Sequence, residues 1–135
     1  MNSPPTQEAA SSHPDGVVVY IVDDEPLLVD LAEIALLPEG YRVKKFYAGA
    51  TTLKSMAAEP VQPDLLITDY AMSPMNGVEL SEQCKQMYPE IKIIMVSGTA
   101  GPEIIVSSPV KIDRFLQKPY RPHELIELVR SVLAE

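Results

Sequence analysis

Several features are scarce or missing in this sequence, and each absence excludes a class of protein. The chain has one cysteine, Cys84, so neither an internal disulfide framework nor a cysteine-rich metal site is available to it. No apolar run approaches the length of a membrane span, and the polar start lacks the apolar core of a signal peptide. We therefore expect a soluble protein of the cytoplasm.

Positive charge is also scarce. The chain carries 11 lysine and arginine residues against 19 aspartate and glutamate residues, which gives a formal net charge of -8 at pH 7. Binding to nucleic acid or to an anionic membrane requires a basic face, so we expect neither as a direct partner. The 135 residues, of which 46% are apolar, suit one globular domain with a sizeable core.

The beginning of the chain differs in composition from the rest. Residues 1–16 are rich in Pro, Ser, Ala and Thr and contain no large apolar residue after Met1. This composition predicts a disordered tail over residues 1–16 and a folded domain over residues 17–135. His13 lies in the predicted tail, where we expect a solvated side chain rather than a metal ligand.

Beyond the tail, a strand followed by a helix is predicted five times over. Short apolar or alternating runs predict strands, and longer one-sided apolar patterns predict helices. The strands are predicted at 17–22, 41–47, 64–69, 91–96 and 112–117, and the helices at about 26–38, 51–58, 77–88, 102–108 and 122–134. Right-handed crossovers in such a chain give a parallel sheet with helices on both faces.

Two of the helices carry more specific expectations. The first is predicted to start with a capping acid before Pro26 and to bury Leu27, Leu28, Leu31, Ala32 and Ala35. The helix predicted at 102–108 is rich in β-branched residues and is stopped by Pro109. We therefore predict that it is short and either mobile or partly unwound.

Polar side chains follow the carboxyl ends of four predicted strands, in the order Asp23-Asp24, Asp69, Ser97 and Lys118. Each alone has an ordinary explanation as a helix cap, a turn residue or a solvated charge. Together they are expected at one edge of a parallel sheet, and open α/β sheets bind ligands at that edge. The pattern therefore predicts a functional site.

The chemistry of phosphoryl transfer requires these residue types. Three carboxylates at one edge repel one another unless a cation lies between them, and a small set of hard oxygen ligands suits Mg²⁺. Asp69 would then be the nucleophile that forms an aspartyl phosphate. Lys118 would pair with one phosphoryl oxygen, and the Ser97 hydroxyl would donate to another.

Five blocks of the sequence resemble the receiver domain of two-component response regulators. In chain order they are Ile21-Val22-Asp23-Asp24-Glu25-Pro26, Leu66-Ile67-Thr68-Asp69, Met75-Asn76-Gly77, Ile94-Met95-Val96-Ser97-Gly98 and Phe115-Leu116-Gln117-Lys118-Pro119. The resemblance covers nearly everything from Val17 to Ala134. It implies an α/β flavodoxin-like fold, a doubly wound five-stranded parallel sheet in the order 2-1-3-4-5 with helices on both faces.

The resemblance also implies roles for the site residues. Asp69 would accept a phosphoryl group from a histidine kinase or a phosphotransfer protein. Asp24 and Asp69 would bind Mg²⁺ directly, Asp23 mainly through water, and the backbone carbonyl of Ala71 would complete the set. The bond between Lys118 and Pro119 is expected to be cis.

A conformational switch is a further implication of the resemblance. On phosphorylation Ser97 would move toward the phosphoryl group and Phe115 would turn inward. The face formed by the fourth helix, the fifth strand and the fifth helix would then meet a downstream protein. A phosphorylation-dependent homodimer is one form that this contact can take.

The sequence departs from the family pattern in the loop Tyr70-Ala71-Met72-Ser73-Pro74-Met75, where the proline comes one place later than usual. Gly77 keeps its expected distance, so we expect a reshaped loop of unchanged length. Ala71 and Thr99 are small where the family tunes water access, which favours a short-lived phosphoryl group.

Other functions remain open from the sequence alone. An Mg²⁺-dependent phosphatase with an aspartate nucleophile usually has a second acid two residues later, where this chain has Ala71. A flavodoxin-like nucleotide module would need a glycine-rich loop after the first strand, and none is present. A receiver fold that works without phosphate as an interaction module is the third alternative.

No output domain fits after the last predicted helix. If the sequence is complete, the resemblance implies a stand-alone receiver, and if it is a fragment, the regulatory part of a longer regulator. In both cases we expect a signalling domain rather than an enzyme that turns over an external substrate.

Overall fold

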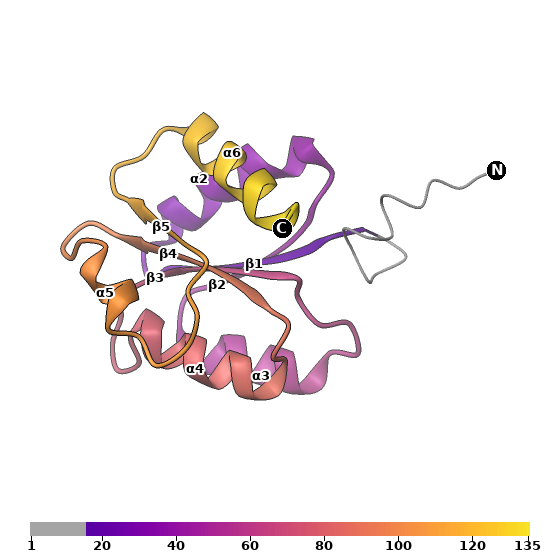
Figure 1. The fold of residues 1–135 in the computed structure, drawn as a ribbon. Coiled ribbons are helices and arrows are strands. Elements are labelled where there is room, and N and C mark those ends of the chain that lie inside the picture. The colour runs from indigo at the N-terminus through magenta and orange to yellow at the C-terminus, as the bar shows by residue number, and fades with distance from the viewer. Residues whose placement is uncertain (1–15) are drawn as a thin grey trace.

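The computed structural model describes residues 16–135, in which strands and helices alternate along the chain (Figure 1). The predicted tail, with His13 in it, falls outside the described residues except for Gly16, and it stays a prediction. The elements are β1 (Val18–Val22), α2 (Pro26–Leu36), β2 (Arg42–Phe46), α3 (Gly49–Ala58), β3 (Leu65–Asp69), α4 (Gly77–Met87), β4 (Lys92–Ser97), α5 (Glu103–Val106), β5 (Arg114–Gln117) and α6 (Pro122–Leu133). A short 3-10 turn, Leu37–Glu39, follows α2.

The strands form one five-stranded parallel sheet in the order β2-β1-β3-β4-β5, which confirms the predicted topology. Helices α2 and α6 cover one face of the sheet, and α3 and α4 cover the other (Figure 1). No helix of the described part of the chain is long and apolar enough to span a membrane.

Two buried clusters, one on each face of the sheet, form the core. Side chains alternate along each strand, so Val19 and Ile21 of β1 face the α2 and α6 side while Tyr20 faces the α3 and α4 side. In register, Val19 pairs with Leu65 and Ile21 with Ile67. Because both faces are covered, the central strands β1, β3 and β4 are mostly apolar along their interiors. Each fully buried apolar side chain contributes about 1.5–3 kcal/mol.

The orientation of α2 corrects one prediction. Leu27 and Leu31 are 67% and 52% exposed, whereas Val29, Ala32 and Leu36 face the sheet. Both stripes of this helix are apolar, so spacing alone does not show which one faces the core. The prediction of a capping acid is also wrong, because no side chain of the described residues accepts a hydrogen bond from the first turn of α2. Asp23 Oδ1 instead accepts the N–H of Glu25, the residue before the helix, at 3.0 Å.

The segment between β4 and β5 contains the single-turn helix α5, and this confirms the prediction of a short helix there. Ile104 is buried, and Val106 is 86% exposed. The neighbouring Phe115 on β5 is half-buried and packs against the α3 and α4 side of the core. This part of the fold therefore rests on few buried side chains.

Candidate functional site

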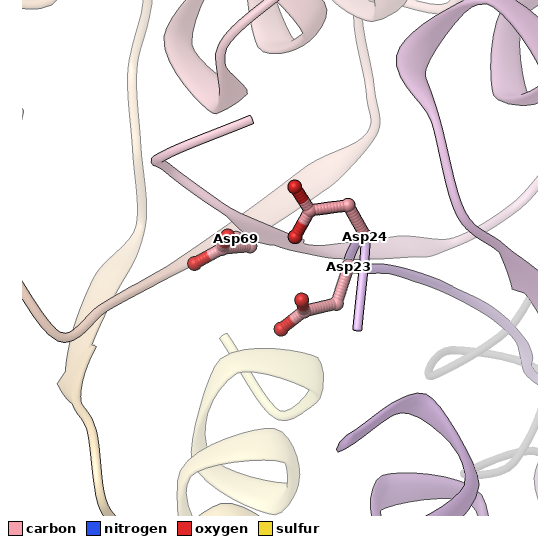
Figure 2. Close-up of side chains that lie close together, drawn as sticks. All are labelled: Asp23, Asp24 and Asp69. Carbon is pink, nitrogen blue, oxygen red and sulfur yellow. The ribbon is translucent and has the colours of Figure 1, made fainter. Parts of the chain in front are cut away.

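Asp23, Asp24 and Asp69 meet at the carboxyl edge of the sheet (Figure 2). Asp69 is the last residue of β3, and Asp23 and Asp24 directly follow β1. The two strands are neighbours, and Val22 pairs with Thr68, so Asp23 and Asp69 occupy adjacent strand ends. The apolar strands end at this edge because a carboxylate further inside would be desolvated without a partner.

The three carboxylates are close enough to share one ion. One oxygen atom from each of the three lies within 4.8 Å of the others, with Asp23 and Asp69 buried and Asp24 exposed. Three carboxylate oxygens with an opening to water match the hard oxygen ligands of Mg²⁺. The residues present therefore fit the predicted ion.

Lys118 reaches this site from the end of β5. Its Nζ lies 2.8 Å from Asp23 Oδ2, 3.1 Å from Asp69 Oδ1 and 3.9 Å from Glu25 Oε1. The backbone positions it, because the Lys118 N–H donates to the Ser97 carbonyl oxygen at 2.8 Å. The bond between Lys118 and Pro119 is cis, as the resemblance implied.

Charge is unevenly balanced in the site. Burial, then the negative charge of Asp23, raise the pKa of Asp69 above its ordinary value, although Lys118 acts in the opposite direction. For Lys118, burial alone would lower the pKa, but the bonds to Asp23 and Asp69 outweigh burial and raise it. One ammonium group thus leaves an excess of negative charge, which a divalent cation would reduce.

Ser97 lies at the same edge but bonds to its own loop. The buried Ser97 Oγ accepts the N–H groups of Ala100 at 2.9 Å and Thr99 at 3.3 Å. A serine hydroxyl that accepts two bonds still has its own proton to donate. The predicted donation to a phosphoryl oxygen is therefore chemically open to Ser97.

The loop after Asp69 leads into α4 through a defined cap. Asn76 Oδ1 accepts the Glu79 N–H, and Glu79 Oε1 accepts the Asn76 N–H, both at 2.9 Å. Ala71 is exposed in this loop, and the metal-binding role of its carbonyl stays a prediction, as does the switch role of Phe115. The bond between Ser73 and Pro74 in this loop is also cis.

Sequence reasoning missed the surroundings of Lys118. A cavity of about 340 Å³ lies beside it, lined by Leu28, Leu31, Lys118, Pro119, Tyr120 and Pro122. Burial raises the pKa of the Tyr120 hydroxyl, with a further contribution from the charge of Asp23. No local pattern in the sequence indicates this cavity, because its lining comes from the first turns of α2 and from the segment that leads from β5 into α6.

Known proteins resemble this chain in sequence. Residues 19–130 match the family model described as the response regulator receiver domain. The transcriptional regulatory protein GlrR of Escherichia coli K12 is 28% identical over 118 residues, which are 87% of this chain and 26% of that protein. The DNA-binding response regulator MtrA of Mycolicibacterium smegmatis is 27% identical, over 85% of this chain and 50% of that protein. The chain thus spans half or less of the length of these two relatives.

Solved structures resemble it in fold. A CheY-like response regulator receiver domain protein from Methanospirillum hungatei JF-1 has a TM-score of 0.79 and 30% identity, covering 87% of this chain and 93% of that one. The receiver domain of NtrX from Brucella abortus has a TM-score of 0.77 and 25% identity, covering 85% and 97%. With the predicted strand order and the acidic edge in place, the chain belongs to the response regulator receiver domain family.

Proposed function

We propose that Asp69 accepts a phosphoryl group from a histidine kinase or a phosphotransfer protein, and that the domain passes this signal to a protein partner. The observation that carries the proposal is the convergence of three carboxylates within 4.8 Å, with the Lys118 ammonium in contact with two of them. This arrangement supplies a nucleophile, a set of metal ligands and a counter-charge.

In the transfer, an Asp69 carboxylate oxygen forms a bond to phosphorus while the bond between phosphorus and the donor histidine nitrogen breaks. The imidazole leaves with the electron pair of that bond. Lys118, now 3.1 Å from Asp69 Oδ1, neutralises a phosphoryl oxygen, and Ser97 donates its hydroxyl proton to another. Such reactions depend on positioning and charge neutralisation more than on acid–base chemistry.

Mg²⁺ fits the site on the chemistry of its donors. In this proposal Asp24 and Asp69 would hold it directly, Asp23 would hold it mainly through water, and the Ala71 carbonyl would complete the protein ligands. When bound, the ion supplies charge neutralisation for the transferring group.

Phosphorylation would add about −1.5 to −2 charges at Asp69 and so would alter the hydrogen bonds of Ser97. Moving Ser97 toward the phosphoryl group would break the bonds that its Oγ accepts from Thr99 and Ala100, which lead into α5. We propose that α5, β5 and α6, with Phe115, form the face that then meets a downstream protein or a second copy. In this role the domain signals in the cytoplasm and turns over no external substrate.

Incubation with acetyl phosphate and Mg²⁺, followed by intact mass measurement, tests the proposal. We expect the mass of one phosphoryl group to be gained by the natural protein and lost when the metal is chelated. Asp69→Asn should gain nothing, whereas Asp30→Asn, on α2 and away from the site, should behave as the natural protein. An equal gain in Asp69→Asn, or none in the natural protein, would count against the assignment and favour a phosphate-independent interaction module.

A further inference from the structure

Gly77, the first residue of α4, lies against the backbone of the acceptor residue. A Cβ atom at this position would stand 2.4 Å from the Asp69 carbonyl oxygen, 2.7 Å from Met95 Sδ and 3.0 Å from Tyr70 Cα. The Gly77 N–H also donates to the Tyr70 carbonyl oxygen at 2.9 Å. The start of α4 is therefore seated on the end of β3, at a distance that leaves no room for a side chain.

Both the end of β3 and the start of α4 are fixed in place by hydrogen bonds. Asp69 pairs in register with Val96 of β4, and the Tyr70 N–H donates to the Val96 carbonyl oxygen at 2.8 Å. The start of α4 is held by the reciprocal cap between Asn76 and Glu79. A side chain at position 77 would therefore have to displace the backbone that carries the Asp69 carboxylate.

We propose that Gly77 is a positioning residue for the phosphoacceptor. Because Gly77 has no side chain, the start of α4 packs directly against the backbone of Asp69 and Tyr70. This packing holds the Asp69 carboxylate in the cluster with Asp23 and Asp24. Functional groups must be held within about 0.5 Å of a productive geometry, and a misplacement of about 1 Å can cost about 100-fold in rate. This inference rests on the proposed function of Asp69.

Gly49 provides a matched control. It is also buried and also opens a helix, α3, but the three atoms nearest to a Cβ there all belong to the Met75 side chain, with Sδ at 2.8 Å and Cβ and Cγ at 3.4 Å. Met75 is a half-buried, flexible side chain that can turn aside, whereas the Asp69 carbonyl oxygen cannot. Both glycine-to-alanine changes favour helix formation to a similar degree, so a difference between them reports the contact with the acceptor.

The experiment compares Gly77→Ala, Gly49→Ala and the natural protein. Calorimetric Mg²⁺ titration, the rate of phosphorylation by acetyl phosphate and the backbone amide NMR shift of metal-free Asp69 are measured, with thermal unfolding to check the fold. We expect Gly77→Ala to bind Mg²⁺ about tenfold more weakly, to react at least about tenfold more slowly and to move the Asp69 amide signal. Gly49→Ala should stay within about twofold of the natural protein in Mg²⁺ affinity and in phosphorylation rate.

A double variant, Gly77→Ala with Met95→Val, separates the two close contacts. The valine removes the sulfur atom at 2.7 Å and leaves the contact with the Asp69 carbonyl oxygen at 2.4 Å. We expect the weak Mg²⁺ binding to persist in this variant. Recovery would overturn the proposal, because the fault would then lie in packing against Met95.

Other results would also overturn it. One is a Gly77→Ala variant whose Mg²⁺ affinity and phosphorylation rate equal those of the natural protein. Another is an equal loss of affinity and rate in Gly77→Ala and Gly49→Ala. A third is loss of the native fold in Gly77→Ala alone. The last result would assign the glycine to the fold as a whole. A natural protein that takes up no phosphoryl group would refute the proposed function instead, and the Mg²⁺ titration and the Asp69 amide signal would still decide the role of Gly77.

Discussion

The acidic edge and the segment around α5 both follow carboxyl ends of strands in the same sheet, yet they are built in opposite ways. Every residue of β1 and β3 is buried, and these strands carry the three carboxylates at their ends. Helix α5 is a single turn whose Val106 is 86% exposed and whose Ile104 alone is buried. The acidic edge is held by strands that are buried in the core on both faces of the sheet. The α5 segment has little buried surface and is connected to the sheet through the hydrogen bonds of the Ser97 loop.

In the proposed function, this difference would separate the phosphoryl transfer at Asp69 from the conformational response around α5. Groups that must keep a geometry to within a fraction of an ångström are placed on elements fixed by packing. Segments with little buried apolar surface open at a lower free energy, and moving elements are drawn from such segments. Ser97 connects the two regions, because it ends a buried strand and bonds to the loop that leads to α5.

The largest expected effect comes from truncating side chains in the two regions. Leu66→Ala removes a fully buried side chain of β3, and we expect the free energy of unfolding to fall by about 3–4 kcal/mol. Ile104→Ala on α5 should cost only about 1–2 kcal/mol, because the site can collapse at the surface. Urea unfolding measures both, and equal losses would break the comparison.

Removing the counter-charge should have the next largest effect. Lys118→Ala leaves Asp23 and Asp69 without their ammonium partner, and we expect a loss of about 2 kcal/mol without Mg²⁺. Saturating Mg²⁺ should restore part of this loss, because an ion held by the three carboxylates would bind only the folded state. The control is Lys44→Ala, which removes an exposed pair with Glu59 at 3.4 Å and should cost less than about 0.5 kcal/mol. If Mg²⁺ left this loss unchanged, the proposal that Mg²⁺ and Lys118 act on the same carboxylates would be contradicted.

The ionised Asp69 carboxylate should destabilise the metal-free fold at neutral pH. Because the pKa of Asp69 is raised in the folded state, the folded protein holds its proton more tightly than the unfolded chain does. The free energy of unfolding therefore falls as the pH rises from below the ordinary value of 3.8 through the raised pKa. Asp69→Asn removes this cost and should raise the melting temperature by about 2–4 °C at pH 7, with the gain fading at acid pH. Thermal scans across pH measure it, and a gain that grows toward acid pH would reverse the sign.

The smallest effect is expected at the tip of α5. Val106→Ser should change the free energy of unfolding by less than about 0.5 kcal/mol, because the side chain is 86% exposed. If the α5 face meets the downstream protein, the same change should weaken that binding by about tenfold or less. A destabilisation above about 1 kcal/mol in urea unfolding would show that α5 is held more firmly than its exposure indicates.

The sheet and the acidic site could be predicted because parallel strands buried on both faces leave continuous apolar runs. The carboxylates of Asp23 and Asp69 stand where those runs stop, and the strand order then brings them together. The contact between Lys118 and Asp69 followed from the same topology, although the two residues are far apart in sequence.

Other features depended on packing that a local pattern does not contain. The orientation of α2 could not be read from spacing, because Leu27 and Leu31 form one apolar stripe and Val29 and Ala32 form another. Two further features depend on where chain segments meet in three dimensions. They are the hydrogen bonds of Ser97 to its loop and the close packing of Gly77 against the Asp69 backbone.

The buried thiol has a practical consequence. Cys84 is the only cysteine in the sequence, it is buried in α4, and burial raises its pKa to about 12. A thiol so rarely ionised at neutral pH reacts slowly with maleimides and iodoacetamides. A cysteine introduced by Val106→Cys would therefore be labelled selectively, so a fluorophore or spin label could follow α5 in the otherwise natural protein.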